Sequence, residues 1–123
     1  VPTVAPSDTG ATMAVPALGP RGNRRLARRV NRAGLRLHAA GDHYEAARVF
    51  ASAAQADPAN PVSLYNFACA LARLGRHERA FEVLEHIAAR GCRQCAERIT
   101  RALEDPDLAP LRARIATLQA SAP

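Results

Sequence analysis

The 123-residue sequence contains no lysine and no tryptophan, and it has few aromatic residues and few cysteines. All seventeen of its basic residues are arginine, and its formal net charge is +6. Aromatic residues make up 4% of the chain, while 48% is hydrophobic, much of it alanine. Small apolar side chains with few β-branched runs favour closely packed helices over a sheet. Three cysteines are too few for a disulfide-based scaffold.

A long apolar run and an initial methionine are also absent. No stretch approaches the roughly 18 apolar residues of a membrane-spanning helix, so we expect none. Because the chain begins at Val1, we expect that something upstream has been removed, by processing or by truncation. A signal peptide or an anchor would belong to that part. The compartment therefore stays open: cytoplasmic, or periplasmic if such a segment was removed.

The first 22 residues differ in composition from the rest of the chain. Residues 1–22 hold four prolines and three glycines and show no helical period. Such segments favour extended, mobile linkers over packed structure. We therefore predict a flexible N-terminal tail or linker over residues 1–22 and one helical domain over residues 23–120.

From residue 23 onward, the apolar residues recur at helical spacing in six segments. The first segment has an apolar face made of Leu26, Val30, Ala33 and Leu37. The expected N-caps are Asn23, Asp42 and Asn60, and the expected helix ends are Gly41, Gly75 and Gly91. Apolar residues over 95–102 predict a fifth helix, and those over 108–118 predict a sixth.

Two segments of the chain are similar in sequence and lie 34 residues apart. GDHYEAARVF at residues 41–50 is followed by GRHERAFEVL at residues 75–84. The chain resembles the tetratricopeptide repeat, a 34-residue helix–turn–helix with small residues where its two helices cross. The matching positions are Gly34, Gly41, Ala46, Phe50, Ala53 and Pro58 in the first unit, and Ala68, Gly75, Ala80 and Leu84 in the second.

This resemblance implies an all-α fold, an α-solenoid of antiparallel helix pairs. It predicts two clear repeats, followed by a degenerate third repeat and capping helices with a polar outer face. EDPDLAPLR, residues 104–112, is similar to a segment that closes bacterial repeats of this kind. The chain thus resembles a short bacterial member of the family.

The resemblance also implies a non-catalytic role as an adaptor or scaffold. In such repeats the first helix of each pair lines a concave groove, which receives a peptide or helix of a protein partner. Carried onto this sequence, the groove residues are Arg28, Asn31, His38, Tyr65 and Arg73. Because two repeats make a shallow groove, pairing with a second copy through an exposed end is a further expectation.

No enzymatic constellation accompanies the repeats. The four histidines are spread along the helical segments, and none forms an HExxH pair or a nucleophile motif. We therefore expect no catalytic residues, no cofactor and no metal, and we interpret the histidines as structural or surface residues.

Arginines gather between residues 21 and 36, where no acidic residue occurs. They are Arg21, Arg24, Arg25, Arg28, Arg29, Arg32 and Arg36. This basic stripe is open to three interpretations: a solvated helix face, a site for an acidic protein, or an anion-binding surface for nucleic acid or an anionic membrane. Nucleic acid is disfavoured, because the few aromatic residues belong to the expected core and leave no stacking platform.

Cys92 and Cys95 form a CxxC motif at an expected helix boundary. Three interpretations remain open: small buried apolar residues, a local disulfide, or a thiol redox or metal site. A zinc site needs about four ligands, and no second CxxC or paired histidines are present. A thioredoxin-like motif would follow a strand, whereas here a helix comes before it.

Overall fold

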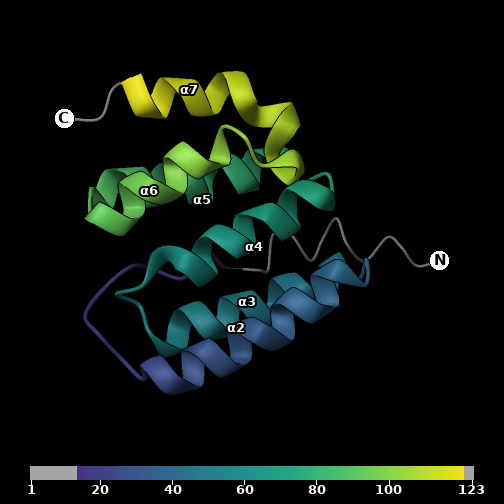
Figure 1. The fold of residues 1–123 in the computed structure, drawn as a ribbon, viewed down its shortest axis with the longest axis vertical. Helices are drawn as coiled ribbons and strands as arrows, with labels where there is room; N and C mark the ends of the chain where they lie inside the picture. The colour runs from purple at the N-terminus through teal and green to yellow at the C-terminus, as the bar shows by residue number, and fades with distance from the viewer. Residues whose placement is uncertain (1–13, 121–123) are drawn as a thin grey trace.

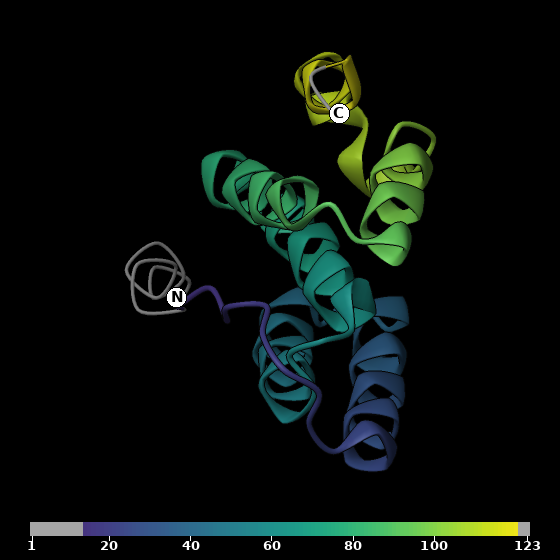
Figure 2. The same ribbon diagram turned by 90° about the vertical axis from the view of Figure 1, so that its left-hand side faces the viewer.

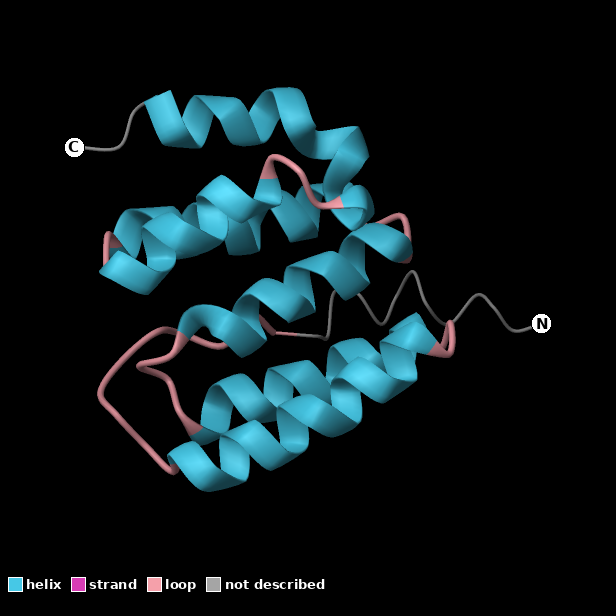
Figure 3. Ribbon diagram, viewed as in Figure 1, coloured by secondary structure: helices cyan, strands magenta, loops and turns pink. Residues whose placement is uncertain are grey.

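Six α-helices and one 3-10 helix build residues 14–120, the part of the chain that the computed structural model describes (Figures 1 and 3). The elements are α2 (Arg24–Ala39), α3 (His43–Ala56), α4 (Pro61–Arg73), α5 (His77–Arg90), α6 (Arg93–Ala102), η1 (Pro106–Leu111) and α7 (Arg112–Ala120). These residues contain no strand, so the predicted all-α class is confirmed. None of these helices has the length and apolar character that crossing a bilayer requires.

The helices form antiparallel hairpins that stack along the long axis of the molecule. Figure 2, which looks along the helices, shows α3 and α5 on one side, α2 and α6 on the other, and α4 between them. Helix α4 is the central element, because it contacts α2, α3, α5, α6 and η1. The N-caps form as predicted: Asn23 Oδ1 accepts a hydrogen bond from Leu26 N, and Asn60 Oδ1 accepts one from Val62 N, both at 2.9 Å.

Small residues set the close packing within the hairpins. Ala46 and Ala80, which occupy equivalent positions in the two repeats, are fully buried. In α2 the buried positions are Ala27 and Gly34, whereas Leu26, predicted on the apolar face, is 39% exposed. The apolar face is therefore rotated by about one residue from the predicted one. The reason is Gly34: a Cβ there would lie 2.6 Å from the Phe50 ring, so this glycine lets α2 approach α3.

The C-terminal cap consists of two elements where one helix was predicted. Pro110 lies inside the 3-10 helix η1, and the α-helix α7 begins only at Arg112. A proline has no N–H to donate, which explains why no single α-helix runs through this segment. Leu108, Leu111 and Ile115 are buried and anchor the cap to the preceding hairpin.

The segment before α2 contains no helix but contacts the helical domain. Gly19 N donates to Pro58 O at 2.9 Å, and Gly22 N donates to Asp57 Oδ1 at 2.9 Å. Val15 and Leu18 pack against the core. The predicted mobile tail therefore differs from the structure over residues 14–22, which are held against the turn between α3 and α4. For residues 1–13, which lie outside the described part of the chain, it stays a prediction.

Candidate functional site

Of the five predicted groove residues, two lie at one end of the surface formed by α2 and α4, two line a cavity at its other end, and one is buried. At the C-terminal ends of these helices, His38 and Arg73 both bind Asp107 of η1. His38 Nε2 donates to Asp107 Oδ2 at 2.8 Å, and Arg73 Nη1 donates to Asp107 Oδ1 at 3.1 Å. The acidic turn that follows α6 therefore occupies this end of the surface.

Tyr65, which was expected in the open groove, lies in the core and is only 2% exposed. Its hydroxyl donates to Asp105 Oδ2 at 2.6 Å, and the Cys69 thiol donates to the same oxygen at 3.6 Å. The difference arises because the turn at Asp105 folds over the middle of α4. Burial, together with the nearby Cys69 and Asp105, raises the pKa of Tyr65 far above its usual value.

Asp107 and two histidines form a short hydrogen-bonded chain at this end. An ionised carboxylate only accepts, so His38 donates from Nε2, and a neutral His38 then accepts at Nδ1. His43 Nδ1, which lies 2.9 Å from His38 Nδ1, is the donor in that arrangement. Burial lowers the pKa of His43, and so do the charge that His38 carries when it is protonated and the charge of Arg73. Burial of Asp107 opposes its ionisation, but the hydrogen bonds from His38 and Arg73 prevail and lower the pKa of its carboxyl.

Cys69, Asp105 and Asp107 are the one group in residues 14–120 that brings three potential metal ligands together, within 4.8 Å of one another. Both carboxylates already accept hydrogen bonds, and burial raises the pKa of the Cys69 thiol. The three side chains are thus already engaged in the contacts that hold the turn after α6 against α4.

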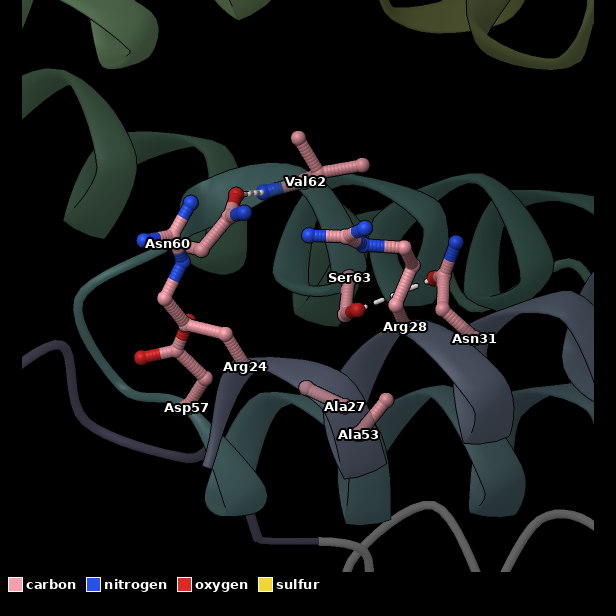
Figure 4. Close-up of a pocket in the computed structure, with 9 residues that line it drawn as sticks. All are labelled: Arg24, Ala27, Arg28, Asn31, Ala53, Asp57, Asn60, Val62 and Ser63. Atoms are coloured by element: carbon pink, nitrogen blue, oxygen red, sulfur yellow. Dashed lines mark hydrogen bonds between the residues drawn. The ribbon is translucent and has the colours of Figure 1, made fainter. Parts of the chain in front are cut away.

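The other end of the inner surface is open. Beside the N-terminal half of α2, a cavity of about 130 Å³ lies between α2, α3 and α4 (Figure 4). Arg24, Arg28 and Asn31 line it from α2, with Val62 and Ser63 from α4. Asn31 Oδ1 accepts hydrogen bonds from Ser63 Oγ at 2.9 Å and from Asn66 Nδ2 at 3.0 Å. The Asn31 amide nitrogen donates no hydrogen bond within the described part of the chain, so it is available to a ligand.

The arginine stripe of α2 is exposed along its length. Arg24, Arg25, Arg28, Arg29, Arg32 and Arg36 are all exposed, as is Arg21 before the helix. Within residues 14–120, none of them forms an ion pair. Asp57, which lines the cavity beside Arg24, is buried and accepts the Gly22 N–H. The stripe thus presents uncompensated positive charge next to the open half of the inner surface.

Cys92 and Cys95 are joined by a disulfide at the start of α6. Of the three interpretations of this motif, the local disulfide is the one that the structure contains. Cys69 is a free, buried thiol.

The sequence did not identify Asp105 and Asp107 as the groups that bind Tyr65, His38 and Arg73. The available signal was the run EDPD at residues 104–107, in which two carboxylates flank a proline-containing turn directly after a helix. Which basic residues they would contact depends on the path of the chain after α6, which the periodicity does not specify.

Residues 37–91 match the family model of the tetratricopeptide repeat. No curated protein and no solved structure matches the chain. The matched segment runs from the end of α2 to the end of α5 and so includes the turn within each of the two hairpins. This match, on stacked antiparallel helix pairs with small residues at their crossings, supports the resemblance of residues 37–91 to the tetratricopeptide repeat.

Proposed function

We propose that the chain is a non-catalytic module that binds a segment of a protein partner on the open half of its inner surface. Tetratricopeptide repeats generally mediate protein–protein interaction. The observation that carries the proposal is the open cavity beside α2, whose polar side chains have hydrogen-bonding capacity to spare.

Three side chains of α2 share the face that borders this cavity. Arg28, Asn31 and Leu35 lie three and four residues apart and so project from the same side of the helix. Leu35 is 44% exposed, which is unusual for a large apolar side chain in this domain. Arg28 supplies a charged donor for a carboxylate, Asn31 an amide donor for a backbone carbonyl, and Leu35 an apolar contact.

The expected partner segment is therefore short, with at least one acidic and one apolar side chain. Positive charge of the stripe favours encounter with an acidic surface. His38 and Arg73 contribute less than the sequence suggested, since both already bind Asp107. Tyr65 is left out of the proposed surface because it is buried.

The test is capture of partners from lysate of the source organism at moderate salt, with and without nuclease, using matched variants. Arg28→Gln with Leu35→Ala removes two exposed side chains and should leave the fold intact. Arg48→Gln, on the exposed side of α3, removes the same charge elsewhere. We expect a discrete protein whose retention survives nuclease, falls at least tenfold in the double variant and is unchanged in the control. Equal retention by all three proteins, or loss of everything after nuclease treatment, would contradict the proposal.

A further inference from the structure

The CxxC disulfide has features that the binding role does not use. Cys92 is the N-cap of α6, and Cys95 lies in the first turn of that helix. Their disulfide closes a loop of only a few residues. Short loops remove little conformational freedom from the unfolded chain, so this bond adds less stability than a long-range disulfide would.

The two sulfurs differ in access. Cys95 is fully buried in the core, beside Ile99 and Ala102 on the inner face of α6. Cys92 is half-buried and therefore reaches solvent. A thiolate approaching from solution can thus attack only Cys92, and Cys95 must be the sulfur that leaves.

The start of α6 stabilises negative charge on the accessible sulfur. The backbone N–H of Cys95 donates to Cys92 Sγ at 3.0 Å. The partial positive charge at a helix N-terminus favours a thiolate over a thiol at this position. Arg90 and Arg93 flank Cys92 in the sequence, and no acidic residue lies between them. Cys92 therefore has the surroundings of a good leaving group and of a reactive thiolate.

From these observations we propose that Cys92–Cys95 is an exchangeable disulfide that reacts with dithiol reductants while the chain stays folded. The inference is independent of partner binding on α2. In the first step, a thiolate of the reductant bonds to Cys92 Sγ. The Cys92–Cys95 bond breaks, and its electron pair leaves on Cys95 Sγ, which takes up a proton.

In the second step, the other thiolate of the reductant attacks the reductant sulfur that is bonded to Cys92 Sγ in the mixed disulfide. Cys92 leaves as the thiolate, and the reductant becomes a disulfide. Two electrons have then passed from the dithiol to the chain, and of the two protons that the dithiol loses, one is on Cys95 and the other is released to solvent. We expect helix α6 to stay in place, because Ile99 and Ala102, which anchor it in the core, take no part in the reaction.

Two measurements test the inference on the folded chain. In the first, the wild-type protein is treated with dithiothreitol in native buffer, quenched with iodoacetamide and mapped by mass spectrometry. We expect a reduction rate proportional to the dithiothreitol concentration. A rate that does not depend on that concentration would mean that reduction waits for unfolding and would overturn the proposal.

The second measurement uses matched single-cysteine changes and oxidised glutathione as the probe. Cys95→Ser leaves Cys92 available, Cys92→Ser leaves Cys95, and the buried Cys69 is an internal control in both. We expect glutathione on Cys92 in Cys95→Ser to form at least tenfold faster than glutathione on Cys95 in Cys92→Ser, with Cys69 unmodified. Equal rates, or reaction only in denaturant, would overturn the assignment of Cys92 as the attacked sulfur. Circular dichroism of both variants shows that the comparison is made on folded chains.

Discussion

His38 and Asp107, which are 69 residues apart in sequence, are joined by a hydrogen bond of 2.8 Å between Nε2 and Oδ2. The bond links the last turn of α2, in the first repeat, to η1 in the C-terminal cap. Arg73 of α4 binds the other oxygen of the same carboxyl. One side chain of the cap thus connects the inner helices of both repeats, so the cap closes the end of the inner surface as well as the end of the solenoid.

Replacing Asp107 by asparagine should weaken this closure. The change removes the charge that holds His38 and Arg73 while keeping the shape of the side chain. Since hydrogen bonds to charged groups contribute about 1.5–3 kcal/mol and Arg73 is half exposed, we expect a loss of about 1–3 kcal/mol in the free energy of unfolding. Urea unfolding measures this loss. Glu82→Gln, which breaks the exposed pair with Arg79, is the control and should cost less than about 1 kcal/mol. Equal effects of the two changes would show that Asp107 has no special role.

Replacing Tyr65 by phenylalanine should destabilise the domain although the ring stays in place. The hydroxyl is the nearest donor to Asp105 Oδ2, and its loss leaves a part-buried carboxyl with a weaker set of partners. We expect a cost of about 1–3 kcal/mol in the free energy of unfolding. Tyr44→Phe is a matched control, since Tyr44 is partly buried and makes no hydrogen bond through its hydroxyl in residues 14–120. A Tyr65→Phe variant as stable as Tyr44→Phe would contradict the expected role of this bond.

Stability should fall as the pH drops from about 7.5 to 5, and His43 should account for part of the fall. The pKa of His43 is lowered in the folded chain, so the unfolded chain binds a proton more readily. The contribution is therefore fully present above the usual histidine pKa of about 6.5 and is lost as the pH falls through the folded value. The lowered pKa of Asp107 acts in the same direction, but only below its usual value of about 3.9.

The measurement is chemical denaturation of the wild type and of His43→Gln at several pH values between 5 and 7.5. Glutamine cannot take up a proton, so the variant should show a flatter dependence in this window. An unchanged slope would mean that other groups carry the pH dependence. Asp42, Arg73 and His38 face His43 and are present in both proteins, so the comparison isolates the histidine.

The fold was largely predictable because each helix end has a local signal. Asn23 and Asn60 cap helices through their own side chains, and Gly91 ends α5 in a left-handed conformation. The 34-residue spacing of Ala46 and Ala80 then set the pairing of the helices, since small residues are needed where helices cross. These features depend on residues close together in sequence or on the repeat itself.

The candidate site was predictable only in part, because contacts between distant segments decide which of its residues are exposed. Arg28 and Asn31 were placed on this surface by the resemblance to the tetratricopeptide repeat, and both line the cavity beside α2. Tyr65 occupies the position of the second repeat that is equivalent to Asn31, yet it is buried because the turn at Asp105 returns over α4. Helical periodicity gives the face of a helix on which a residue lies, but not which later segment covers that face.

A single added methyl group at Gly34 should destabilise the domain, contrary to the usual effect of alanine in a helix. Alanine in place of glycine in a helix interior normally gains up to about 1 kcal/mol. Here the new Cβ would lie 2.6 Å from two carbons of the Phe50 ring, which is fully buried. We therefore expect Gly34→Ala to lower the free energy of unfolding by about 1–3 kcal/mol, the usual cost of overpacking.

The combined change Gly34→Ala with Phe50→Leu should cost less than the sum of the two single changes, because the smaller side chain removes the clash. Thermal unfolding of the four proteins gives this coupling, and a stabilising Gly34→Ala, or strictly additive effects, would show that the close approach of α2 to Phe50 does not require glycine.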